Sequence, residues 1–209
     1  MAKYRDYRLI GLELEGAWNR YINERIRTDV SVNARGDMVG EIGSPPMRLP
    51  QALIWMRENY PDVVNASCGL HVHVSLNDLD TARLTDPKFY EMFQQRFTEW
   101  GERNKIKGTF WTRLKGKNRY CKNNFVPYQQ LSGNGDRYTQ INFCSYRKYK
   151  TVECRMLPAF KNVETSQLAV IEFVKIVQDY LKSCPKESLY QKLSIASTDV
   201  TYVEEEIVW

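Results

Sequence analysis

The feature that most constrains this chain is the strict alternation of apolar and polar residues in the segment 68–76, which reads CGLHVHVSL. Successive side chains of a strand point to opposite faces of a sheet. His71 and His73 therefore share one face of the predicted strand, while Val72 and Val74 share the other. These are the two histidines of the chain, so both imidazoles are expected on a single surface.

Five other segments show the same alternation and are predicted to be strands. They cover residues 8–16, 28–33, 37–45, 137–146 and 150–157. Amphipathic helices, which can cover the apolar faces of these strands, are predicted over residues 49–61, 86–105 and 162–182. Asp86 is the expected N-cap of the second helix, and Pro87 is its expected first residue. Strands and helices without a regular βαβ rhythm predict an α+β domain. We expect a curved, mainly antiparallel sheet with helices packed on one face and a polar active-site cup on the other.

The polar faces of the six predicted strands carry an unusual set of side chains. A face exposed to water is the simplest explanation, but such faces commonly contain lysine, and no strand core here does. If the strands are neighbours, four carboxylates converge. Like charges at that distance repel strongly unless a proton or a cation neutralises them. The carboxylates are those of Glu13, Glu15, Glu41 and Glu153.

Oxygen ligands accompanied by one imidazole suit Mg²⁺ or Mn²⁺, whereas a zinc site would be richer in histidine and cysteine. Arg155, on the same face, can bind a carboxylate or phosphate through two parallel hydrogen bonds. Basic residues of the following loops are expected to reach over the site. Together these groups predict phosphoryl-transfer chemistry. The loop cations are Arg113, Lys115, Lys117, Arg119 and Arg137.

Five motifs, in this order along the chain, resemble the amidoligase family: GLELEG, GEIGSPPM, CGLHVHVSL, RYTQIN and TVECR. This family contains carboxylate–amine ligases related to glutamine synthetase and γ-glutamylcysteine synthetase. The resemblance runs from about Leu9 to Arg155. It implies a glutamine synthetase-like catalytic fold and an ATP-dependent ligation. A small-molecule or peptide carboxylate would become an acyl phosphate, and an amine acceptor would then displace the phosphate.

The resemblance also implies roles for single residues. Gly43 departs from the family pattern, which more often has a β-branched residue there. Asp29 and Ser31 are similar to a polar strand that family members often show. The implied metal ligands are Glu13, Glu15, Glu41, His71 and Glu153. The implied nucleotide contacts are His73, Arg119, Arg137 and Asn142, and the implied catalytic residues are His73, Glu153 and Arg155.

Two other functions remain open at this point. Carboxylates with a histidine also serve metal-dependent phosphoesterases and nucleases, and the basic run 103–123 is either a solvated loop or a surface for a phosphate backbone. A non-catalytic nucleotide- or peptide-binding module with the same fold is the other alternative. We expect ATP with Mg²⁺ (or Mn²⁺) as cofactors and do not expect nucleic acid as a partner.

Length and composition set the remaining expectations. The 209 residues predict a single domain over 1–209. The five cysteines are odd in number and lack metal-site spacing, which indicates reduced thiols and a cytoplasmic location. No apolar stretch is long enough for a bilayer, so no membrane association is expected. Trp55 and Trp100 are predicted to be core residues, and the acidic run 204–206 a solvated edge. Oligomeric state is left open.

Overall fold

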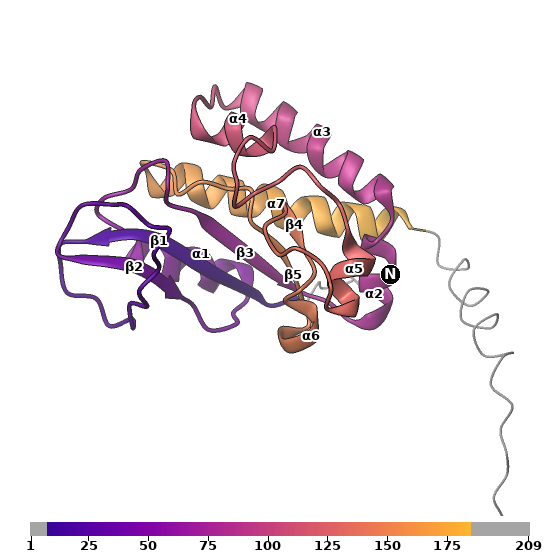
Figure 1. Cartoon of the computed structure of the whole chain (residues 1–209), viewed down its shortest axis with the longest axis horizontal. Helices are drawn as coiled ribbons and strands as arrows, with labels where there is room; N and C mark the ends of the chain where they lie inside the picture. The colour runs from indigo at the N-terminus through magenta and orange to yellow at the C-terminus, as the bar shows by residue number, and fades with distance from the viewer. Residues whose placement is uncertain (1–7, 185–209) are drawn as a thin grey trace, which may run out of the picture.

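The computed structural model describes residues 8–184 and contains a five-stranded antiparallel sheet (Figure 1). The strand order across the sheet is β2-β1-β3-β5-β4. This arrangement confirms the predicted α+β class and the mainly antiparallel sheet. The predicted limits 1–209 and the acidic run 204–206 extend beyond the described residues. The strands are β1 (Ile10–Trp18), β2 (Met38–Gly43), β3 (Leu70–Ser75), β4 (Ile141–Asn142) and β5 (Thr151–Cys154).

The long helices lie on the apolar face of the sheet. α7 runs along the sheet and contacts β3, and α3 packs beside α7 (Figure 1). Leu12, Leu14 and Val72 on the strands are fully buried, as are Phe93 and Phe97 of α3. The opposite face of the sheet is thereby left for polar side chains. The helices are α1 (Leu49–Asn59), α2 (Asp78–Leu84), α3 (Pro87–Arg103), α4 (Thr109–Leu114), α5 (Pro127–Ser132), α6 (Tyr146–Tyr149) and α7 (Val163–Ser183).

Local sequence signals explain where the predicted helices begin. The Asp86 side chain accepts a hydrogen bond from the backbone N–H of Lys88, and Pro87 opens α3 as predicted. The Asn162 side chain caps α7 by accepting from Thr165 at 2.9 Å. Trp55 and Trp100 are buried in the core, which confirms their predicted structural role.

The strand predicted over 28–33 is wrong. These residues form a turn in which the Asp29 carboxylate accepts from both the backbone N–H and the hydroxyl of Ser31, each at 2.7 Å. Such a local hydrogen bond competes with sheet pairing. Val30, expected to face the core, is fully exposed at the tip of this turn.

The fifth predicted strand, 137–146, is much shorter than expected. β4 is limited to two residues, and α6 begins at Tyr146. Before β4, the Gln140 side chain donates to the backbone carbonyls of Arg113 and Leu114, so it anchors the C-terminal end of α4 instead of facing the cup. The basic run 103–123 was expected to be a loop, but it contains α4.

The cysteines of the chain are all free, in agreement with reduced thiols. Cys154 is fully buried, while Cys144 is only partly covered. Among residues 8–184, no helix combines the length and apolar character that a membrane span requires.

Candidate functional site

The strand register brings the predicted polar residues together on one face. Directly opposed residues of antiparallel strands have side chains on the same face. Glu13 is opposite His71, and His73 is opposite Glu153. The outer pairs are Glu15 with Glu41 and Asn142 with Glu153. We call this set the polar cup: Glu13, Glu15, Glu41, His71, His73, Asn142, Glu153 and Arg155.

His71 lies among carboxylates from three directions. Its Nδ1 is 3.0 Å from Glu13 Oε2 and 3.7 Å from Glu153 Oε1, and its Nε2 is 3.6 Å from Glu15 Oε1. The imidazole is 4% exposed. Burial of one imidazole among carboxylates on β1 and β5 follows from the central position of β3 in the sheet.

His73 has one satisfied nitrogen and one open nitrogen. Its Nδ1 is 3.1 Å from the Thr151 hydroxyl. Its Nε2 is buried, lies 3.6 Å from Glu13 Oε1, and has no hydrogen-bond partner among the described residues. Burial acts to lower the pKa of His73, yet Glu13 and Glu153 hold it above its ordinary value. The open nitrogen faces the cup as a ligand or donor.

Glu153 is the most enclosed carboxylate of the cup. Its Oε1 accepts from Arg155 at 2.6 Å, and its Oε2 accepts from the Asn142 amide at 2.7 Å. Burial acts to raise the pKa of Glu153, but Arg155 and both histidines hold it below the ordinary value. Arg155 is itself buried, and its Nε has no hydrogen-bond partner among the described residues.

At the β2 edge, Glu15 and Glu41 lie beside the Asp29 turn. Glu15 accepts from the Gly69 backbone N–H. A Cβ added at Gly69 would lie 2.9 Å from His71 Nε2 and 3.0 Å from Glu15 Oε2, so only glycine fits there without a shift. The backbone approaches the cup closely at this point, which explains why position 69, just before β3, is a glycine.

Three overlapping groups of the described residues can hold a cation. In each group the ligand atoms lie within 4.8 Å of one another. Glu13 and Glu41 each belong to two groups, so neighbouring groups share a ligand residue. The groups are Glu13–Glu41–His71, Glu13–His73–Glu153 and Glu15–Asp29–Glu41.

The carboxylates of the cup affect one another. Burial raises the pKa of Glu41 to about 7, and the negative charge of Glu13 adds to this effect. Burial acts in the same direction on Glu13, but the hydrogen bond with His71 and the nearby charges of His71 and His73 outweigh it and hold the pKa of Glu13 far below its usual range. Repulsion by the neighbouring carboxylates therefore acts strongly on the charged form of Glu41.

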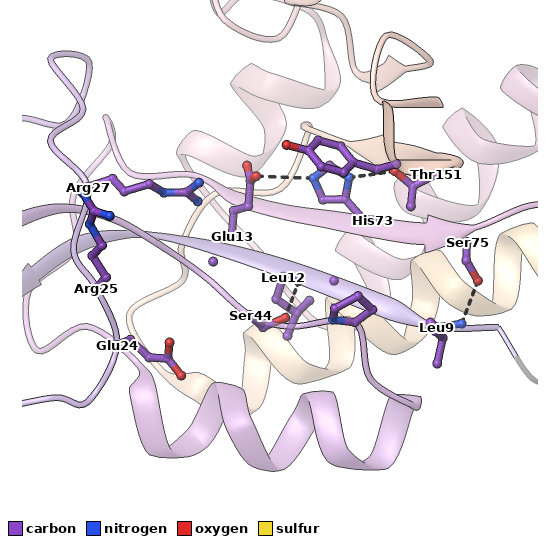
Figure 2. A pocket seen from close by; sticks show the side chains of 14 residues that line it. Leu9, Leu12, Glu13, Glu24, Arg25, Arg27, Ser44, His73, Ser75 and Thr151 are labelled. Atoms are coloured by element: carbon purple, nitrogen blue, oxygen red, sulfur yellow. Dashed lines mark hydrogen bonds and ion pairs between the residues drawn. The ribbon is translucent and has the colours of Figure 1, made fainter. Parts of the chain in front are cut away.

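A groove with a volume of about 670 Å³ adjoins the cup at the Glu13–His73 pair (Figure 2). In Figure 2, Leu9 and Ser75 lie at one end, and Arg25 and Arg27 of the β1–β2 loop lie at the other. Gly43, Tyr149 and Thr151 also line the groove.

The predicted loop cations are distributed differently from the cup residues. Arg119 and Arg137 are exposed and lie over the rings of Tyr120 and Tyr138. Burial acts to raise the pKa of Asp29, but the hydrogen bonds from Ser31, aided by the charges of His71 and Arg137, hold it below its ordinary value. Arg113 does not reach over the site. It is buried, and it donates to the backbone carbonyls of Cys68 and Leu157, which tie the start of β3 to the end of β5.

Two residues of the β1–β2 loop were not predicted as site residues. Asp29 was assigned to a polar strand, yet its carboxylate joins Glu15 and Glu41. The spacing of Asp29 and Ser31 is typical of a side-chain turn, and this signal was present in the sequence. Arg27 forms a salt bridge with Glu41 at the β2 edge of the sheet. No sequence pattern near Arg27 indicates that contact.

Comparison of the chain with protein-family models, with curated proteins and with solved structures gave no match. The motifs of the sequence and the geometry of the polar cup are therefore the basis on which a function is proposed.

Proposed function

We propose that this protein is an ATP-dependent carboxylate–amine ligase with a glutamine synthetase-like catalytic fold. The observation that carries the proposal is the position of Glu13, which joins one histidine and one further carboxylate in each of two candidate cation groups. Paired cation groups on one polar sheet face suit the transfer of a phosphoryl group from a nucleotide. The amidoligase-like motif order supports the same assignment.

The donor set of the cup fits Mg²⁺ or Mn²⁺. Each imidazole-containing group combines two carboxylates with one histidine, and such oxygen-rich sets favour these ions. The raised pKa of Glu41 supports this fit, because a cation would relieve the repulsion that causes part of it. A bound cation would supply positive charge to phosphate oxygens. Glu13, Glu15, Glu41, His71 and Glu153 would hold it, with Asp29 as an additional ligand.

The groove is proposed to hold the nucleotide. Its volume lies within the usual range for small-molecule sites. Tyr149 and Ser75, which both line the groove, suit a base and ribose, while His73 would face the phosphates with its open nitrogen. Asn142, which donates to Glu153 in the cup, would form part of the polar wall beside the groove. Arg137 and Arg119 would contact phosphate from their exposed loops.

Arg155 is proposed to bind the substrate carboxylate. One of its terminal nitrogens is engaged by Glu153, and its Nε has no partner among residues 8–184. The ion pair fixes the plane of the guanidinium, which presents the remaining donors in a defined direction. Glu153 would thereby have two roles, as a cation ligand and as the residue that orients Arg155 toward the substrate.

The test measures phosphate release from ATP with Mg²⁺ against a panel of amino acids, peptides and amines. We expect release to require both a carboxylate and an amine, and to be lost in Glu13→Gln and His71→Ala. Glu99→Gln is the matched control, because Glu99 is exposed on α3, beyond the core. Retained turnover in both cup variants would refute the site.

The same assay separates the two alternatives. Hydrolysis of a phosphodiester by the metal-loaded protein without ATP would favour a phosphoesterase or nuclease. Binding of a non-hydrolysable ATP analogue without turnover on any substrate pair would favour a non-catalytic binding module.

A further inference from the structure

We infer that Arg27 recognises the terminal phosphate of a polyphosphate in the groove, and that a cation makes Arg27 available by taking the carboxylate of Glu41. This inference rests on the proposed nucleotide site and assigns a role to a residue outside the amidoligase-like motifs. In this exchange Glu41 leaves Arg27 for the cation and Arg27 binds the phosphate, so binding of the cation and binding of the anion are coupled.

Backbone pairing fixes the direction of the Arg27 side chain. Arg27 donates to the Glu41 carbonyl at 2.8 Å, and Glu41 donates to the Arg27 carbonyl at 2.9 Å. Arg27 is therefore directly opposite Glu41 in an antiparallel bridge that extends the sheet beyond β2. Opposed residues share a face, so Arg27 is on the polar face, in line with Glu41 and Glu15.

The guanidinium lies along the groove. An Arg27 terminal nitrogen is 2.8 Å from Glu41 Oε1, and the same nitrogen would be 2.7 Å from a Cβ at Gly43. Gly43 and Arg27 both line the groove. Figure 2 shows the Arg27 side chain directed toward Glu13. The glycine thus leaves room for the guanidinium beside the proposed phosphate position.

Arg27 and a cation compete for one carboxylate. Glu41 belongs to two of the three candidate cation groups, and Arg27 already engages one of its oxygens. The Arg27 side chain is 55% exposed, so it is free to reorient when a divalent ion takes the carboxylate. A released guanidinium presents donors in the geometry that phosphate oxygens accept.

This exchange predicts reciprocal coupling. A cation that frees Arg27 strengthens anion binding, and by thermodynamic linkage the anion strengthens cation binding to the same extent. Replacement of Arg27 should then have opposite effects on the two ligands measured separately. A residue that only supports the loop would weaken both.

The experiment compares the wild type with Arg27→Gln, Arg25→Gln and Arg20→Gln. Arg25 lines the groove, but among residues 8–184 it is Arg27 that pairs with Glu41. Arg20, on the same loop, binds Asp62 away from the cup. Mn²⁺ affinity is measured by electron paramagnetic resonance without nucleotide. Affinity for adenylyl imidodiphosphate is then measured by calorimetry with Mn²⁺ in saturating excess, so that the analogue is chelated equally for every variant.

Arg27→Gln should bind Mn²⁺ roughly threefold more tightly, because an exposed ion pair with Glu41 is removed. It should bind the analogue about tenfold more weakly, because a charge-assisted contact is lost. Arg25→Gln should weaken only the analogue, and Arg20→Gln should change neither affinity.

The outcomes separate the inference from the proposed function. Unchanged or equally weakened affinities in Arg27→Gln, with normal binding by the wild type, would overturn the exchange and leave the nucleotide site standing. A wild type that fails to bind the analogue at all would overturn both.

Discussion

Glu153 and Arg155 form a buried ion pair, with 2.6 Å between Glu153 Oε1 and a terminal nitrogen of Arg155. Their side chains are 5% and 9% exposed. Burying two charges is costly, and the pair offsets that cost only while both partners are present. The stability of the fold and the charge of the cup therefore depend on the same contact.

Arg155→Gln should destabilise the metal-free protein by about 3 kcal/mol, since it leaves the Glu153 carboxylate buried without its main counter-charge. Added Mn²⁺ should restore part of this loss, because Glu153 belongs to a candidate cation group. Urea unfolding with EDTA or with Mn²⁺ provides the measurement. In a double-mutant cycle, Glu153→Gln should cancel much of the effect, whereas simple additivity would contradict the pairing.

Gly69→Ala should weaken Mn²⁺ binding by about tenfold, because the new Cβ would lie within 3.0 Å of polar atoms on both His71 and Glu15. Gly11→Ala is the matched control on the same sheet face. Its Cβ would be 3.5 Å from the Cβ of His73, an ordinary contact. Mn²⁺ titration of both variants tests the prediction, and equal affinities would contradict it.

Glu41→Gln should stabilise the metal-free protein at neutral and alkaline pH. Burial raises the pKa of Glu41 from 4.5 to about 7. The folded state therefore keeps a proton that the unfolded chain releases, and this contribution to stability is lost as pH rises from 4.5 through about 7. The gain of the variant over the wild type should grow by about 2 kcal/mol between pH 5 and pH 8.

Thermal unfolding in EDTA across that pH range measures the effect. Mn²⁺ should reverse the order of stability at pH 8, because the ion favours the ionised carboxylate that only the wild type has. A pH-independent difference between the two proteins would show that Glu41 is not the titrating group.

Asp29→Asn should lower Mn²⁺ affinity while keeping the local turn. The amide oxygen of asparagine can still accept from the Ser31 backbone, but it lacks the charge that joins Glu15 and Glu41 in the third cation group. We expect roughly tenfold weaker binding of one Mn²⁺ equivalent. Asp29→Ala, which loses the turn as well, should be at least as weak, and wild-type affinity in both would remove Asp29 from the site.

Within β1, β3 and β5, the alternation of side chains predicted which residues share the polar face. Glu13, His71 and Glu153 were grouped because a period of two is imposed by strand geometry alone. The order and register of the strands determine which carboxylate meets which imidazole, and these depend on contacts between segments remote in sequence. The pairing of Glu13 with His71 therefore emerged only in the folded structure.

The errors arose where a polar side chain hydrogen-bonds a backbone group. The Asp29 carboxylate binds Ser31 locally, and an alternating segment became a turn. Gln140 instead donates to the carbonyls of Arg113 and Leu114, 27 and 26 residues earlier in the chain, and the predicted strand is reduced to β4. Periodicity does not reveal either contact, because both are made by polar residues that also fit a strand pattern.

The central position of β3 has a consequence for synthesis on the ribosome. His71 contacts Glu13 across 58 residues of sequence, and His73 contacts Thr151 across 78. At 5–20 residues per second, roughly 4 to 16 s separate the emergence of β3 from that of β5. During this interval a nascent chain exposes one unpaired edge of β3, and chaperone protection of that edge would matter most then.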